Sequence, residues 1–262
     1  MSPKLPSFID TETSSSGGFI GVISDIHGNV DALDAVFADA RTQGVISMIC
    51  LGDIIGYGPE PGACLQLVRE ACDHVVMGNH EMMMLMIELG IAKDMGPELT
   101  PALQLALSQL STSDLKWVKK LPLGIDLEVM GIVHASFYEP ENFHYILESN
   151  DAEHCVQEQP GNLSFHGHTH EPVIWEVDLQ GAMGFLPNAK PYSLRPDTRY
   201  SINVGSVGQP RDGDSRATYC IFDPHTSSIW HRRVQYDIAK AQSRFERTHL
   251  RAFDRDRLLA GH

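Results

Sequence analysis

The sequence predicts an α/β protein whose core contains two layers of β-sheet. Residues 19–78 alternate short apolar runs with segments of helical period, which is the β-α-β-α-β pattern of a parallel sheet. Residues 163–234 form a series of predicted strands separated by Gly, Pro and Asp turns, which favours mostly antiparallel pairing. The length of 262 residues, 42% of them hydrophobic, allows one large domain or two. One domain over residues 19–262 accounts for both patterns.

The predicted strands of the first half are the apolar runs at residues 19–24, 46–52 and 74–78. Between them, residues 29–43 carry apolar side chains at helical spacing, and residues 60–72 are also predicted to be a helix. Strands joined by helices in this way are parallel, with right-handed crossovers, and they bind ligands at their carboxyl ends.

A helical insertion is predicted over residues 81–120, in three segments. Ser113 could cap the last segment, although no acid or amide follows it at the spacing of a capping box. Four methionines lie between residues 82 and 86. Because Met is a common core filler, we expect a helix packed over the sheet in preference to a ligand cleft.

A second insertion, residues 138–159, is predicted to mix loop and helix and is polar and aromatic. Its position suggests that Tyr138, Phe143 and His144 could form a substrate wall. A final helix is predicted over residues 236–250.

Charge and composition exclude several classes of function. The formal net charge is −14 and Lys and Arg do not cluster, so no nucleic-acid partner is expected. No apolar run is long enough to span a bilayer, and residues 1–18 are predicted to be a disordered tail without a signal-peptide core. The five cysteines form no CxxC pair, which predicts reduced thiols in a cytoplasmic protein. The oligomeric state is left open.

Side chains that bind metals or hydrogen-bond follow five apolar runs, where each predicted strand ends. The segments are SDIHGN, LGDIIGYG, MGNHE, VHAS and HGHTH, and their candidate metal ligands are Asp25, His27, Asp53, Asn79, His134, His168 and His170. In an extended segment, residues i and i+2 point the same way, so each Asp-x-His or His-x-His pair can present two ligands to one region.

Seven ligands are too many for one tetrahedral ion, so the sequence predicts two divalent ions. Carboxylate and imidazole together suit Mn, Fe, Zn, Co or Ni, with Mn or Fe favoured, and do not suit Ca. Asp53 is the best bridge, because it stands alone at its strand end and has two oxygens. Two ions, less the charges of Asp25, Asp53 and a bridging hydroxide, leave a net charge of about +1, which favours a phosphate anion.

The motifs Asp-x-His, Gly-Asp, Gly-Asn-His-Glu, a lone His and Gly-His-Thr-His occur in that order between Phe19 and about Arg233. Their order resembles the calcineurin-like metallophosphoesterase superfamily. The stretches GDIIGYGPEP and NVGSVGQPRDGD are similar to those of its small prokaryotic phosphodiesterase-like members. The resemblance implies a four-layer α-β-β-α sandwich, in which helices flank two mixed β-sheets and the active site lies at the C-terminal ends of strands.

The resemblance also implies a role for each ligand. The first ion would be held by Asp25, His27, Asp53 and His170, and the second by Asp53, Asn79, His134 and His168. His80 would lie beside the metals as the catalytic residue, contacting the substrate phosphate together with Asn79 and protonating the leaving oxygen. The resemblance gives His166 no role. It is therefore interpreted either as a core residue or as a residue that supports the ligands from behind.

Three further positions carry hypotheses. Arg211, in the Gly-rich segment GSVGQPRDG, is a candidate phosphate contact, and an ordinary turn arginine is the equal alternative. Glu81 is interpreted as a helix-start acid in preference to a ligand. Protein phosphatases of the superfamily carry an Asp and an Arg after the Gly-Asp motif, whereas Gly56 and Tyr57 stand there, which puts protein phosphatase activity in doubt.

The predicted reaction is therefore hydrolysis of a small-molecule phosphate ester by in-line attack of a metal-bridging hydroxide. A nucleotide-type phosphodiester is the first candidate substrate, and a dinucleoside polyphosphate or a phosphomonoester is the alternative. A non-catalytic scaffold on the same fold is the alternative of another class, and the complete ligand set counts against it. A lactamase-type metal hydrolase is disfavoured, because the sequence has no H-x-H-x-D-H block.

Overall fold

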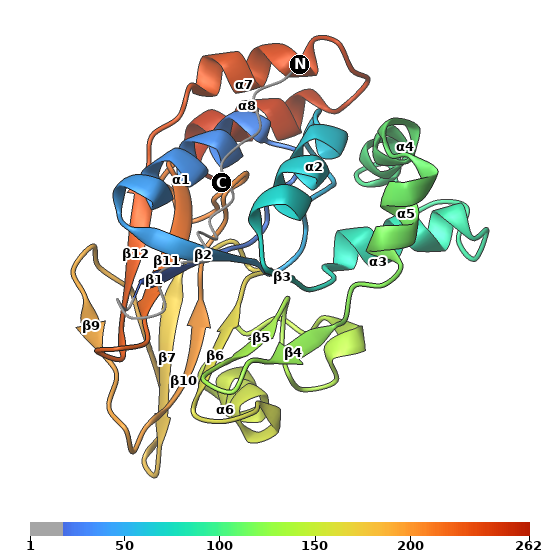
Figure 1. Ribbon diagram of the computed structural model, residues 1–262. Coiled ribbons are helices and arrows are strands. Elements are labelled where there is room, and N and C mark those ends of the chain that lie inside the picture. Colours follow the sequence, from blue (N-terminus) through green and yellow to red (C-terminus); the bar gives the residue numbers. More distant parts are fainter. Residues whose placement is uncertain (1–17) are drawn as a thin grey trace.

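Two stacked six-stranded sheets form the centre of the protein (Figure 1). The computed structural model describes residues 18–262, so the predicted tail lies outside the described residues except for Gly18. The first sheet contains, in spatial order, β3 (His74–Val75), β2 (Val45–Cys50), β1 (Phe19–Ile23), β11 (Ala217–Asp223), β12 (Ser228–Val234) and β9 (Tyr192–Ser193). The second contains β4 (Gly124–Asp126), β5 (Gly131–Val133), β6 (Leu163–His166), β10 (Arg199–Asn203), β7 (Val173–Asp178) and β8 (Gly181–Phe185).

Both sheets are mixed, as expected. The strands β1, β2 and β3 are parallel, and β11 joins β1 in antiparallel register. In the second sheet, β6 lies between β5 and β10 and is parallel to both, whereas β7 and β8 pair antiparallel. The prediction of mostly antiparallel strands over residues 163–234 is confirmed, because within that range only the β6–β10 pair is parallel. Helix α6 (Ser149–Glu158) joins β5 to β6, and a parallel pair needs such a crossover.

Alternating side chains of the central strands fill two cores at once. In β1, Val22 faces the second sheet and packs with Phe165 and Ile202, whereas Ile23 faces the outer helices. Helices α1 (Val30–Thr42) and α2 (Pro61–Ala71) cover the outer face of the first sheet, and α6 covers the outer face of the second. These layers make the α-β-β-α sandwich (Figure 1).

Three helices form the predicted insertion: α3 (Asn79–Glu88), α4 (Thr100–Gln109) and α5 (Thr112–Val118). They gather beyond the β3 edge of the first sheet, beside α2, instead of lying over the sheet face (Figure 1). Met84 is fully buried there, so its expected role as core filler is confirmed. The cap predicted at Ser113 is wrong. Ser111, two residues earlier, caps α5, and the Asp114 carboxylate accepts a hydrogen bond from the Ser111 amide at 2.9 Å, which completes a capping box.

Two predicted elements are shorter in the structure. The strand expected over residues 74–78 ends at Val75, because the amide of Met77 donates to Pro122 at 2.8 Å instead of extending the pairing with β2. The last predicted helix, α7 (Ile238–Phe245), stops short of residue 250, and a further helix that the sequence did not suggest, α8 (Ala252–Ala260), packs against it. Strands β8 and β9 and the short 3-10 helix η1 (Pro140–Asn142) were also missed.

None of the helices within residues 18–262 combines the length and apolar character needed to cross a bilayer. The five cysteines form no disulfide in the structure.

Candidate metal centre

Loops from both sheets bring the predicted ligands to one edge. Asp25 and His27 follow β1, Asp53 follows β2, Asn79 and His80 begin α3 after β3, His134 follows β5, and His168 and His170 follow β6. All of these side chains except Asn79 belong to buried residues. The sandwich therefore places together side chains that are up to 145 positions apart in the sequence.

The first group of side chains is Asp25, His27 and His170. The Nε2 atoms of the two imidazoles lie 3.1 Å apart. Asp25 Oδ1 lies 3.3 Å from His170 Nε2 and 3.8 Å from His27 Nε2. Three donor atoms thus surround one point, as the first predicted ion requires.

The second group contains His134, His168 and Asp53, with Asn79 beside them. His134 Nε2 lies 3.0 Å from Asn79 Oδ1, 3.2 Å from His168 Nδ1 and 3.5 Å from Asp53 Oδ2. These are the four residues predicted to share the second ion.

Asp53 lies between the two groups. Its Oδ2 is 3.5 Å from His134 Nε2 in one group and 3.7 Å from His27 Nε2 in the other. Its Oδ1 accepts a hydrogen bond from the His80 amide at 2.9 Å, which fixes the plane of the carboxylate. This placement is what a bridging carboxylate needs.

The hydrogen bonds of the histidines show that the residues present fit metal ions. The Nδ1 atoms of His27, His134 and His170 contact the backbone carbonyl oxygens of Ile55, Leu51 and Gln209 at 2.9, 2.8 and 2.6 Å. A carbonyl oxygen can only accept a hydrogen bond, so each of these rings carries a hydrogen on Nδ1, and in the neutral form its lone pair is on Nε2. The Nε2 lone pairs of His27 and His170 then face each other, and the buried Oδ1 of Asp25 has no hydrogen-bond donor. A cation relieves this crowding of lone pairs, and backbone support of this kind is typical of metal-ligating histidines.

The backbone at the site is unusual. Asp25, His27, Asp53, His168 and His170 all have positive φ, between 47° and 68°. Left-handed backbone is uncommon outside glycine, and it gathers at functional sites. The convergence of the Asp25–His27 and His168–His170 pairs is as predicted, but the expected reason is wrong. Both pairs lie in left-handed turns after the strands have ended, and not in extended segments.

Burial and neighbouring charges shift the pKa values of the cluster in opposite directions. Burial opposes the charged form of Asp53, but His134 and His80 hold the pKa of that carboxyl well below its usual range. Burial also opposes the charged form of His134, yet Asp53 and Asp25 raise its pKa to about 9. Burial, aided by Asp53, raises the pKa of Asp25 to about 6. A proton on His134 thus balances the carboxylates, and metal binding has to displace it.

His80 lies beside the ligands, with Nε2 at 3.8 Å from Asp53 Oδ2. Its Nδ1 is buried and has no partner within residues 18–262. Gly56, which stands where the resemblance places an Asp in the protein phosphatases, lies directly against this nitrogen. Burial lowers the pKa of His80, and Asp53 opposes that change. The neutral ring is therefore favoured when no anion is bound.

Glu81 does more than the helix-start role assigned to it. It is fully buried, and its carboxylate accepts hydrogen bonds from the backbone amides of Gly78, Asp53, Ile54 and Ile55 at 2.8–3.2 Å. One side chain thereby fixes both the start of α3 and the loop that carries Asp53. The Glu after Asn-His was the available signal, but its second set of partners lies 26 to 28 positions away.

The site opens on the side of Asn79, Tyr57, Arg211 and Tyr145, which are not fully buried. The Tyr145 ring stacks on His168 with 4.1 Å between ring centroids, and half of its surface is exposed. Sequence reasoning proposed Tyr138, Phe143 and His144 for a substrate wall and missed Tyr145. Phe143 also reaches the site, with its ring centroid 5.9 Å from that of His134.

Arg211 lies at the same opening, with its guanidinium carbon 5.9 Å from the centroid of the Tyr57 ring. The Tyr57 ring in turn contacts the rings of His27 and His80, at centroid distances of 4.8 and 4.7 Å. His166 is buried, contacts Asn203 at 3.3 Å, and lies in neither ligand group, which agrees with its expected place behind the ligands.

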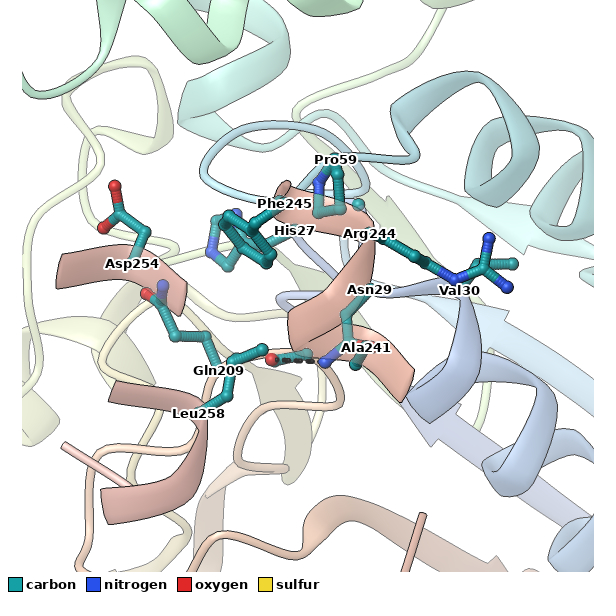
Figure 2. Close-up of a pocket in the computed structure, with 13 residues that line it drawn as sticks. His27, Asn29, Val30, Pro59, Gln209, Ala241, Arg244, Phe245, Asp254 and Leu258 are labelled. Carbon is teal, nitrogen blue, oxygen red and sulfur yellow. Dashed lines mark hydrogen bonds between the residues drawn. The ribbon is translucent and has the colours of Figure 1, made fainter. Parts of the chain in front are cut away.

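A small cavity lies on the far side of His27, between the loop after β1 and helices α7 and α8 (Figure 2). Its volume of about 10 Å³ accommodates roughly one water molecule. Asn29 caps α1 there and donates to the backbone oxygen of Gly208 at 2.9 Å. This cavity lies behind His27 and is too small for a phosphate ester.

Comparison with known proteins agrees with this geometry. The signature of the calcineurin-like phosphoesterase superfamily domain matches residues 19–227. An uncharacterized protein of Methanocaldococcus jannaschii is 36% identical over 249 residues, which cover 92% of this chain and 98% of that protein. The crystal structure of a metallophosphoesterase from Sphaerobacter thermophilus superposes with a TM-score of 0.85 at 34% identity, covering 94% of this chain and 100% of the other. A symmetrical bis(5'-nucleosyl)-tetraphosphatase from a Janthinobacterium strain is 24% identical over 173 residues, which are 64% of this chain and 60% of that protein.

The fold, the sequence signature and the buried His/Asp groups define a metal-dependent phosphoesterase. This chain belongs to the calcineurin-like phosphoesterase superfamily. Its paired groups of ligand side chains are consistent with a dinuclear metal site.

Proposed function

We propose that the protein hydrolyses a nucleotide-type phosphodiester with two divalent transition-metal ions, Mn or Fe first. The observation that carries this proposal is the position of Asp53 Oδ2 between the two ligand groups, at 3.5 Å from His134 and 3.7 Å from His27. The first ion would be held by Asp25, His27, Asp53 and His170, and the second by Asp53, Asn79, His134 and His168. When bound, such ions polarise phosphoryl oxygens and acidify water.

The remaining roles fall to residues of the opening. His80 would contact the phosphate and protonate the leaving oxygen. Its pKa is lowered by burial in the structure, and a phosphate placed between His80 and Arg211 would raise it again, because an opposite charge favours the imidazolium. Asn79 and Arg211 would orient the phosphate by hydrogen bonds.

The exposed face of Tyr145 supports a nucleotide as substrate. One face of its ring stacks on His168, which holds the ring at the mouth of the site, and half of the side-chain surface remains exposed. Aromatic rings held in this way stack on bases of any sequence. A dinucleoside polyphosphate is the second candidate, since a symmetrical bis(5'-nucleosyl)-tetraphosphatase is 24% identical to this chain over 173 residues.

The test is a screen of the Mn²⁺-loaded protein against chromogenic mono- and diesters, cyclic nucleotides and dinucleoside polyphosphates. The D53N and H80A variants serve as controls. D53N should lose at least about 10³-fold in kcat/KM, and H80A about 10²–10⁴-fold, the usual contribution of an acid–base group. Unchanged turnover by D53N rules out the mechanism. A protein that binds no metal even in metal-replete medium and hydrolyses none of these esters would instead favour the non-catalytic scaffold.

A further inference from the structure

Two arginines beside the site share a single neutral acceptor. Arg211 Nη2 and Arg257 Nη1, from the loop after β10 and from α8, each donate to Oε1 of Gln209 at 3.2 Å. The Nε atom of Arg211 is buried and has no partner within residues 18–262. Arg257 Nε donates to the carbonyl of His262. Within residues 18–262, no Asp or Glu side chain lies within 4.0 Å of either guanidinium, and the nearby acids pair with other arginines.

The carboxylates nearest in sequence are already engaged. Asp212 pairs with Arg233, Asp256 pairs with Arg255, and Asp254 makes two hydrogen bonds of 2.9 Å to Arg251. Two guanidinium groups around one amide oxygen repel each other, and arginine does not relieve the repulsion by losing its proton. No Asp or Glu side chain of the described residues neutralises this pair of arginines, so an added anion would be stabilised between them.

Gln209 connects this arginine pair to the metal centre. Its backbone carbonyl accepts the hydrogen bond from His170 Nδ1 at 2.6 Å, while its side-chain oxygen faces the two arginines. Figure 2 shows Gln209 between α8, which carries Asp254 and Leu258, and the loop that carries His27. A group bound by both arginines would therefore lie next to Gln209, whose backbone carbonyl holds His170 of the first ligand group.

We propose that Arg257 adds a subsite for a second phosphate beside Arg211. Arg211 would then contact both this second phosphate and the one that lies on the metal ligands. This inference rests on the proposed function and selects among its candidate substrates. It favours esters with two or more linked phosphates over cyclic diesters and simple monoesters. Two guanidiniums suit this task, because their planar N–H groups match phosphate oxygens in pairs.

Binding measurements test the subsite directly. Inorganic phosphate and pyrophosphate are titrated calorimetrically into the wild-type protein at saturating Mn²⁺, and into R257A, R257K and R255A. The wild type should bind pyrophosphate roughly 10- to 100-fold more tightly than phosphate, because the second phosphate adds charged hydrogen bonds to Arg257. R257A should abolish this preference, and R257K should keep part of it. R255A removes an arginine of the same helix that pairs with Asp256, and it should change nothing.

Kinetics separate the subsite from the proposed function. With a dinucleoside tetraphosphate as substrate, R257A should raise KM about 10-fold or more. With p-nitrophenyl phosphate, its KM should match the wild type. Equal binding of phosphate and pyrophosphate by the wild type, or an equal loss on both substrates in R257A, overturns the subsite while the phosphoesterase activity stands. If no ester is hydrolysed but pyrophosphate binding depends on Arg257, the proposed function fails and the subsite stands.

Discussion

The carboxylate of Glu81 holds the backbone amide of Asp53 at 2.8 Å, and it binds three further amides around it. A carboxylate is an acceptor at both oxygens, whereas an amide side chain presents a donor at one of them. The position of the proposed bridging residue therefore depends on a side chain that lies behind the site.

We expect the E81Q variant to lose about 2–3 kcal/mol of stability, because its NH₂ group would meet backbone N–H donors in a buried place. Urea unfolding of the metal-free protein measures this loss. E88Q is the matched control at the other end of α3, where Glu88 pairs with Lys119 at a partly exposed position, and it should stay within about 0.5 kcal/mol. If E81Q unfolds at the same urea concentration as the wild type, the hydrogen bonds between Glu81 and the four backbone amides contribute nothing to stability.

Metal content should report the two ligand groups separately. The wild type should bind two divalent ions per chain, and H170A should retain about one, because only the first group loses a ligand. The affinity of the first ion should fall by more than the 10- to 100-fold that loss of an outer partner costs. Elemental analysis after dialysis measures this stoichiometry. H166Q changes a histidine of the same segment that lies in neither group, so it should keep both ions. Loss of metal in H166Q, or two tightly held ions in H170A, contradicts the assignment.

Gly56 should be required for activity more than for stability. Its φ is 91°, and a Cβ there would overlap Nδ1 of His80. Misplacing a reacting group by about 1 Å can cost on the order of 10²-fold in rate, so G56A should lower kcat by about that factor and leave the metal content at two ions. Gly96 has a φ of 88° with no atom near its missing Cβ, so G96A introduces similar backbone strain far from His80. Steady-state kinetics on both variants decide the matter, and equal losses would refute the role of Gly56.

His231 should make stability depend on pH. The ring is buried and donates from Nε2 to Asn203 at 2.7 Å, and burial lowers its pKa to about 4. In the unfolded chain the His231 ring takes up a proton near pH 6.5, whereas in the folded protein it does so only near pH 4. The folded state is thus fully favoured above pH 6.5, and stability falls as the pH drops from 6.5 toward 4.

Between pH 7 and pH 5, the metal-free wild type should lose about 1–2 kcal/mol more than H231Q, in which the titrating ring is gone. Urea midpoints in the presence of a chelator measure the difference. H225Q, on an exposed turn, should follow the wild type. Parallel pH profiles for the wild type and H231Q would exclude a native state that keeps His231 neutral.

Several features of the fold were predictable because local chemistry decides them. The apolar runs before Asp25 and Asp53 specify buried parallel strands, and the helical spacing after Asn29 specifies α1. Helix α8 was missed because its sequence is strongly charged, and only packing against α7 buries Leu258. Strand β9 has only two residues and exists through its pairing with β12.

The sequence by itself determined which side chains are candidate ligands and that they follow strand ends, since strands carry periodic apolar patterns that can be recognised without a structure. The tertiary structure alone decided how those side chains are aimed. Left-handed turns at Asp25 and His168, the Glu81 cradle around Asp53, and the meeting of Arg211 with Arg257 at Gln209 all join residues from separate elements. Such contacts depend on how the two sheets and the last helix pack, and distances of that kind are not encoded in any local stretch of residues.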